Sequence, residues 1–159
     1  MTPAPEEAPW LTPALLGLTA LLLDSHASRF PRPLVPRQSV RLAAQELFVL
    51  DQVVLCHDGS SDPSFLYANR AALQLFGRTW EQMVGLPSRF SARAEQRPQR
   101  STLLERVRQQ QALEGYGGER VNSRGRRFQF RGAQLWNLVD AEQRYRGQAA
   151  CFSNWWWEP

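Results

Sequence analysis

Residues 65–92 constrain the fold of this chain most, because they start and stop several helices that are each too short to be stable alone. A short apolar segment, 65–68, leads directly into a predicted helix over 69–76. Asn69 can cap this helix with its side-chain oxygen, and Gly77 stands where the helix must end.

A second short helix follows at once. Thr79 begins it and Gln82 follows three residues later, which is the pattern of a capping box. Gly85 and Pro87 end this helix. Helices as short as these must pack on something larger, and the only candidate is a β-sheet.

The N-terminal part differs in character. Residues 1–9 are rich in proline and acidic, and we expect them to be disordered. Thr12 and Pro13 then start a helix that we predict over 13–29, with an apolar stripe that needs either its own sheet or a second chain. The stripe residues that we expect to form an interaction surface are Leu15, Leu18 and Leu22. A proline-rich linker and a second helix over 38–48 follow.

The apolar run 14–23 is about half as long as a bilayer span requires, so no membrane segment is expected. Cys56 and Cys151 lie far apart, and neither belongs to a C-x-x-C pair. Two unpaired thiols are typical of a cytoplasmic protein.

The second half of the chain predicts mainly strands. A helix over 98–111 is expected to end at the glycines that follow it. The predicted strands are 50–56, 65–68, 119–122, 127–139 and 145–153. Two strands, a helical connection and three more strands predict an α+β domain, with a five-stranded antiparallel sheet, helices on one side of it and N-terminal helices before it.

Aromatic residues mark the predicted strand 127–139. A period of two places Phe128, Phe130, Trp136 and Leu138 on one face of this strand. The tail after the last strand carries Trp155, Trp156 and Trp157. Three adjacent indoles cannot all lie on one side of a strand, so we expect at least one of them to face a groove, the first helix or a partner.

Six short stretches carry a more specific likeness. They are Tyr67-Ala68-Asn69 with Ala71-Ala72-Leu73, Leu86-Pro87-Ser88-Arg89 with Ser91-Ala92, Leu103-Leu104 with Val107, Gly125-Arg126-Arg127-Phe128, Trp136-Asn137-Leu138 with Asp140, and Gly147-Gln148-Ala149-Ala150. In this order and spacing they resemble the MEKHLA domain, a PAS-like family. The resemblance covers roughly 35–157 and divides the chain into a tail with an amphipathic helix, 1–34, and a MEKHLA domain, 35–159. It implies a PAS-like sensory or interaction module and brings no common ligand, cofactor or reaction.

The segment around Ser88 also looks like the helix of light-oxygen-voltage domains that carries a flavin-reactive cysteine. Ser88 stands at the cysteine position, Pro87 replaces an asparagine and Ala92 replaces a glutamine. A hydroxyl cannot form the thiol–flavin adduct. We therefore expect no flavin, and no other cofactor.

Eight residues are candidates to line or border a PAS-type cavity. They are Tyr67, Asn69, Phe76, Trp80, Ser88, Arg89, Trp136 and Gln148. Structural roles compete with ligand binding for each: Asn69 as a helix cap, the indoles as core, Arg89 as a solvated or ion-paired cation, and Gln148 as a partner of backbone groups.

Signals for an enzyme or a metal site are weak. Ser88, His57 and Asp58 could form a triad on paper, but the chain has no G-x-S-x-G elbow and only two histidines. Asp58-x-Ser60-x-Asp62 lacks the glycine and distal glutamate of a calcium loop. No catalytic residue and no metal ligand is predicted.

All 19 basic residues are arginines, and the net charge is +4. Acidic residues lie among the arginine clusters, so a nucleic-acid partner is not expected.

Two functions remain open. The first is a non-catalytic PAS-like sensory or regulatory module that binds a small molecule or a protein, and that forms a homodimer through the helix 13–29. The second is a protein–protein interaction domain whose core is filled. A cavity of less than about 300 Å³, the low end for small-molecule sites, favours the second.

Overall fold

The computed structural model describes residues 7–159. Its helices are α1 (Pro13–Ala27), α2 (Val40–Val49), α3 (Arg70–Phe76), α4 (Trp80–Met83) and α5 (Arg97–Gln110), with 3-10 turns η1 (Pro9–Leu11), η2 (Ser88–Ser91) and η3 (Ala94–Gln96). Its strands are β1 (Val53–Asp58), β2 (Phe65–Ala68), β3 (Ala112–Val121), β4 (Arg127–Val139), β5 (Tyr145–Phe152) and β6 (Asn154–Trp157).

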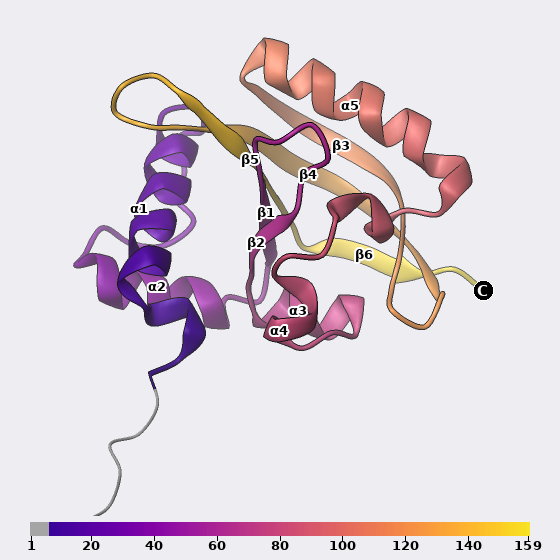
Figure 1. Ribbon diagram of the computed structural model, residues 1–159, viewed down its shortest axis with the longest axis horizontal. Coiled ribbons are helices and arrows are strands. Elements are labelled where there is room, and N and C mark those ends of the chain that lie inside the picture. Colours follow the sequence, from indigo (N-terminus) through magenta and orange to yellow (C-terminus); the bar gives the residue numbers. More distant parts are fainter. Residues whose placement is uncertain (1–6) are drawn as a thin grey trace, which may run out of the picture.

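The strands form one antiparallel sheet in the order β2-β1-β5-β4-β3 (Figure 1). The predicted α+β class with an antiparallel sheet is confirmed. The tail adds a sixth strand, β6, that was not predicted from the sequence. β6 follows β5 directly and pairs with the first half of β4.

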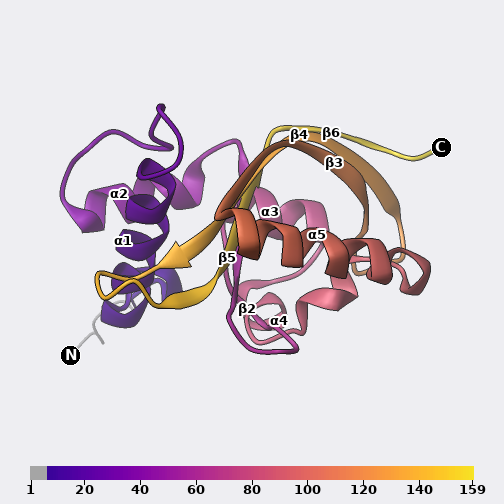
Figure 2. The same cartoon turned by 90° about the horizontal axis from the view of Figure 1, so that it is seen from above.

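Helices cover both faces of the sheet. Figure 2 shows α1 and α2 grouped at one end, while α3, α4 and α5 lie within the curve of β3, β4 and β6. The alternation along β1 explains this arrangement: Val53 packs toward α3 and α5, whereas Val54 and Cys56 pack toward α1 and α2. The apolar stripe of α1 thus has its partner within the same chain, where Leu22 is buried against the sheet.

The predicted face of β4 is wrong. Phe128 and Phe130 pack with α3 and α5, but Trp136 and Leu138 pack on the opposite face, under α1. The cause is Gly132, whose φ of +73° offsets the alternation of sides by one residue. Beyond it, Ala133 and Leu135 take the inner positions.

The prediction for β3 is also wrong. The glycines at 115, 117 and 118 do not separate a helix from a short strand at 119–122; they lie inside a ten-residue strand. α5 ends at Gln110, the next residue Gln111 caps it with a φ of +74°, and β3 starts directly after Gln111. The β3–β4 pairing is irregular on both sides of Tyr116, so this glycine-rich strand at the sheet edge accommodates bulges instead of ending the element.

The local predictions in 65–92 are confirmed. The Oδ1 atom of Asn69 accepts from the backbone N–H of Ala72, and α3 ends at Gly77 in the left-handed conformation. Thr79 and Gln82 form both hydrogen bonds of a capping box at α4.

Two further expectations concern the N-terminal part. The predicted disorder of 1–9 falls mostly outside the described residues. The division at residues 34 and 35 stays a prediction, although α1 shares a core with the sheet.

No helix between residues 7 and 159 has both the length and the apolar character to cross a bilayer.

Candidate functional site

A small cavity lies between α5, α3 and the inner face of the sheet, with a volume of about 60 Å³. Apolar side chains make up most of its wall, including Phe65, Phe76, Phe130, Leu135 and Phe152. Its polar lining consists of His57, Ser91, Arg100, Arg120 and Gln148. The cavity is thus a largely apolar space into which a few polar and charged groups converge.

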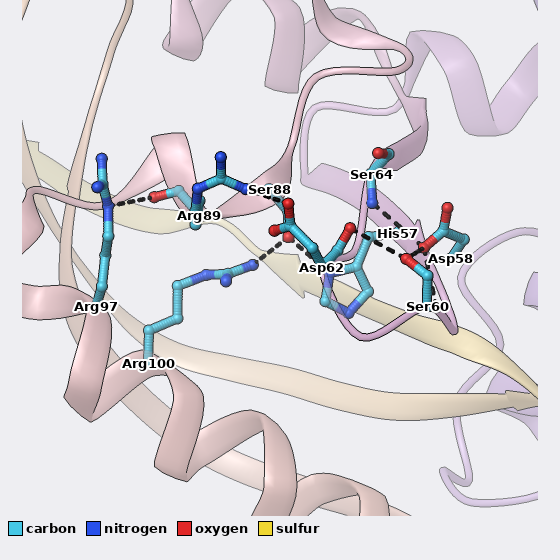
Figure 3. A network of polar contacts seen from close by, with 9 residues as sticks. All are labelled: His57, Asp58, Ser60, Asp62, Ser64, Ser88, Arg89, Arg97 and Arg100. Carbon is cyan, nitrogen blue, oxygen red and sulfur yellow. Dashed lines mark hydrogen bonds and ion pairs between the residues drawn. The ribbon is translucent and has the colours of Figure 1, made fainter.

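A chain of hydrogen bonds runs along one side of this cavity. The Oγ of Ser88 lies 2.9 Å from His57 Nδ1, and His57 Nε2 lies 3.2 Å from Gln148 Oε1. Arg100 reaches from α5 and donates from Nη2 to the same Ser88 oxygen, at 2.7 Å. Figure 3 shows His57 and Arg100 converging on Ser88 from opposite sides. The network therefore joins β1, η2, α5 and β5.

The directions of these bonds follow from their other partners. The amide nitrogen of Gln148 donates to Leu104 O and to Asn137 Oδ1, so its oxygen is the atom that faces His57. The Nε2 atom of His57 must then donate, and Nδ1 accepts from the Ser88 hydroxyl. His57 is a neutral imidazole in this arrangement.

Burial supports the neutral state of His57. Desolvation, together with the nearby Arg100 cation, lowers the pKa of His57 from 6.5 to about 4. Burial and the nearby Arg120 cation lower the pKa of Arg100 to about 10, so Arg100 remains charged at neutral pH.

The network also ties α5 to the sheet beyond the cavity. Asn137 on β4 donates to the Arg108 carbonyl at 3.0 Å, and Gln148 on β5 donates to the Leu104 carbonyl at 2.8 Å. Both acceptors are backbone groups of α5. A displacement of this helix would therefore shift or break direct hydrogen bonds to two central strands, β4 and β5.

Three of the predicted cavity residues lie at this site. Phe76 and Gln148 line the cavity, and Ser88, which has no exposed surface, holds its polar network together. Arg89, the neighbour of Ser88, points away and pairs with Asp62 at the surface. Its position fits the ion-paired alternative.

Asn69 lies in the core between α2, α3 and β1 instead of at the cavity. It caps α3, accepts from the backbone N–H of Val54 at 3.0 Å, and donates to the carbonyls of Gln52 and Leu47 at 2.8 and 3.1 Å. The structural reading of this residue holds, with more partners than a cap alone requires.

Tyr67, Trp80 and Trp136 are not cavity residues. They belong to the core on the α1 and α2 side of the sheet, where Tyr67 and Trp80 make an edge contact and Trp136 donates to the carbonyl of Leu22. For Trp136 the reason is the offset at Gly132 described above.

The predicted interaction residues divide in the same way. Leu22 is buried in the molecule's own core, and Leu15 and Leu18 pack at its edge. Trp155 and Trp157 pack against Phe128, whereas Trp156 is 42% exposed on the other face.

Sequence reasoning missed Arg100, Arg120 and Asn137. Arg100 carried a signal, because its spacing from Leu103 and Val107 places it on the buried stripe of α5. Arg120 and Asn137 carried none, because only the pairing of β3 and β4 decides which way they face.

Ser88, His57 and Asp58 do not form a catalytic triad. The Asp58 carboxylate accepts from Ser60 and Ser64 in the β1–β2 turn and makes no hydrogen bond with His57 (Figure 3). Within residues 7–159 no cluster of side chains could hold a metal ion. Cys56 and Cys151 are free and buried on neighbouring strands, and burial raises the pKa of Cys151 to about 12.

The family described as the MEKHLA domain matches residues 16–157. No sequence among the curated proteins matches the chain.

Solved structures with the same fold are distant in sequence. A PAS domain from Colwellia psychrerythraea aligns with a TM-score of 0.65 and 12% identity, over 74% of this chain and 97% of that one. An RNA-binding light-oxygen-voltage receptor aligns with a TM-score of 0.61 and 15% identity, over 76% and 36%. The LOV domain of a blue-light-activated histidine kinase from Erythrobacter litoralis aligns with 0.52 and 20%, over 62% and 91%. These similarities show a PAS-like fold.

The residues at the cavity do not fit a flavin. The volume of about 60 Å³ is far below the roughly 300 Å³ at which small-molecule sites begin. Ser88 offers a hydroxyl that is already engaged with His57 and Arg100, and it carries no thiol.

Proposed function

The chain belongs to the MEKHLA domain family, and on this premise we propose that it is a non-catalytic, PAS-like sensory or regulatory module. The input site in this proposal is the cavity beside Ser88, His57 and Arg100. The output is a change in how α1 and α2 pack on the outer face of the sheet.

One observation carries the proposal: a connected set of buried polar groups lines a cavity that is otherwise apolar. Filling this space with apolar side chains would be the simpler way to stabilise a core. A buried network of this kind can have two arrangements, one closed on itself and one engaged by a ligand, and such bistability is what a sensor needs.

The sheet provides a route from input to output. His57 faces the cavity from β1, while its neighbour Cys56 faces the α1 and α2 core. Likewise Gln148 on β5 faces the cavity and Ala149 faces that core. A shift of either strand therefore acts on both layers at once.

The absence of catalysis in this proposal rests on the state of Ser88. Its oxygen accepts from Arg100 and its side chain has no exposed surface, so no substrate carbonyl can approach it in this conformation. The group behind His57 is the neutral amide of Gln148, which cannot stabilise an imidazolium as a carboxylate does.

A second function is favoured by the cavity volume. About 60 Å³ is too small for a drug-sized ligand, which supports an interaction domain with a filled core. Its docking surface would include exposed apolar residues such as Leu42 and Val49 on α2 and Trp156 on β6. The two functions differ in whether the cavity network influences the outer helices.

Hydrogen exchange of the full chain tests this difference. Ser88→Ala removes the shared partner of His57 and Arg100, and Ser101→Ala is a matched control on the exposed face of α5. We expect Ser88→Ala to raise amide exchange in α1, while β6, which pairs with β4 away from α1, and the control stay unchanged. Unchanged exchange in α1 would exclude the sensory coupling and leave the interaction domain.

A homodimer through 13–29 and a cytoplasmic location also stay proposals. Since Leu22 is committed to the molecule's own core, a dimer would have to use the remaining surface of α1. Light scattering of the full chain over a range of concentrations tests the dimer.

A further inference from the structure

Two arginines meet at the cavity without an acidic partner. Arg100 comes from α5 and Arg120 from β3, and both line the cavity. Among residues 7–159 neither one forms an ion pair, and no Asp or Glu belongs to the cavity wall. Arg100 is only 8% exposed. Burying a cation without a counter-ion is costly, so this pair needs an explanation.

Most hydrogen-bond donors of Arg100 are unused. A guanidinium has five N–H groups, but the only acceptor of Arg100 within the described chain is Ser88 Oγ. Among residues 7–159, the fully buried side-chain polar atoms without a hydrogen-bond partner belong to Thr19 and Tyr67. The unpaired N–H groups of Arg100 are not among them, so they retain some accessible surface. Arg100 lines the cavity, so the cavity is one space onto which these N–H groups can open.

Arg120 is positioned rather than neutralised. Its Nη1 donates to the Glu119 carbonyl at 2.6 Å, and its guanidinium lies 5.1 Å from the centre of the Phe130 ring. Neither partner removes the positive charge, and the carboxylate of the adjacent Glu119 is paired with Arg93. The two cations are close enough for Arg120 to lower the pKa of Arg100. An anion between them would relieve this repulsion.

The rest of the wall limits the chemistry of that anion. Its other polar groups already have partners, because Ser91 donates to the Ser88 carbonyl and His57 bonds to Gln148. The remaining side chains, such as Phe65 and Leu135, are apolar and offer no hydrogen bond to further charged oxygens. At about 10–15 Å³ for each water-sized group, the volume of about 60 Å³ holds roughly four to six non-hydrogen atoms. One charged end and a short apolar remainder fit this space better than a phosphate, whose oxygens all need partners.

We propose that the cavity binds a short-chain monocarboxylic acid, whose carboxylate is held by Arg100 and Arg120 and whose carbon chain lies against the apolar wall. This inference rests on the proposed function, because it names the ligand class of the same cavity. Binding would draw Arg100 toward the carboxylate, which competes with the Ser88 oxygen for its donors.

Calorimetric titration of the full chain with sodium propionate tests the proposal. Propanamide is the neutral probe of the same shape, and sodium phosphate is the probe of the alternative anion, all at constant ionic strength. We expect propionate to bind with a Kd on the order of 1 mM, and both other probes to bind at least about tenfold more weakly. Equal binding of propanamide, tighter binding of phosphate, or no saturation by propionate up to about 100 mM overturns the proposal.

Variants identify the groups responsible. Arg100→Gln keeps a donor for Ser88 but removes the charge, and Arg106→Gln removes an exposed charge from the same helix. Propionate binding should fall at least about tenfold in the first and stay unchanged in the second. If the Arg100 variant does not fold, Arg120→Gln makes the same distinction. Full propionate binding by these variants would contradict the proposal.

Failure here can be told apart from failure of the proposed function. The exchange experiment on Ser88→Ala uses no ligand, so it can succeed while propionate does not bind. In that case the sensory role stands and the ligand class is wrong. If propionate binds but exchange in α1 does not respond to Ser88→Ala, the cavity is a binding site without the proposed output.

Discussion

The side chains of His57 and Ser88 meet at 2.9 Å although they are 31 residues apart, one on β1 and the other on η2. The serine donates to Nδ1, which fixes the imidazole in its neutral form with the proton on Nε2. This bond holds the segment 65–92 against the sheet at the cavity. Its dependence on protonation leads to the first prediction.

Acid should destabilise the protein through His57. The pKa of this group is 6.5 in the unfolded chain and about 4 in the folded one, so the unfolded state binds more protons between these values. The free energy of unfolding should fall by up to about 3 kcal/mol as the pH drops from 6.5 to 4, and His57 should cause no further loss below that.

The measurement is urea denaturation of the wild type and of His57→Gln across this range. The variant should lack that part of the slope. His26, whose pKa burial also lowers, contributes in the same direction in both proteins and cancels in the comparison. Parallel curves for the two proteins would show that His57 does not titrate between pH 6.5 and 4 as inferred from its burial and the nearby Arg100.

Asn69→Ala should be severely destabilising. The amide of Asn69 serves backbone groups of β1, α2, α3 and the loop before β1, and alanine leaves these buried groups without a partner. We expect a loss of about 3 kcal/mol or more in the free energy of unfolding. Asn154→Ala, on the exposed start of β6, is the control and should change it by less than about 0.5 kcal/mol. A loss below about 1 kcal/mol for Asn69→Ala would mean that water or a local shift replaces the amide.

Gly132→Ala should cost about 1–2 kcal/mol through backbone strain alone. No atom lies within 4 Å of the added Cβ, so packing is not disturbed, but φ is +73°. Gly17→Ala is the matched control, because its Cβ also meets nothing within 4 Å. Since Gly17 lies inside a helix, this substitution should raise the free energy of unfolding by about 0.5–1 kcal/mol. The midpoint temperature of thermal unfolding should fall for Gly132→Ala and rise for Gly17→Ala. A shift in the same direction would argue against the strained conformation at Gly132.

Trp155 and Trp156 should respond differently to alanine. Trp155 packs on Phe128 and Trp157, with ring centres 6.1 and 5.2 Å away, and its removal should cost about 2–3 kcal/mol. Trp156 contacts Arg131 at the surface, and its loss should cost less than about 1 kcal/mol. Light scattering of Trp156→Ala tests its predicted role in association. If that variant is as unstable as Trp155→Ala, Trp156 belongs to the core.

The accuracy of the sequence predictions follows the range of the interactions that each depends on. Asn69, Gly77, Thr79 and Gln82 act on groups within a few residues, so their patterns predict helix starts and ends correctly. Trp136 could not be placed, because a single offset at Gly132 exchanges the faces of everything beyond it. Closely spaced glycines such as those of β3 usually indicate the end of a helix or strand, but pairing with β4 keeps them within a strand.

The sequence by itself determined the helix boundaries of 65–92, the need for a sheet behind them, and the family likeness of the stretches that surround Ser88. These properties depend on local capping and on the order of apolar segments along the chain. Only the tertiary structure decided that His57, Arg100, Arg120 and Gln148 converge beside Ser88 in one cavity. The strand register and the packing of α5 on the sheet bring these residues together, and both depend on contacts between residues that are distant in the chain.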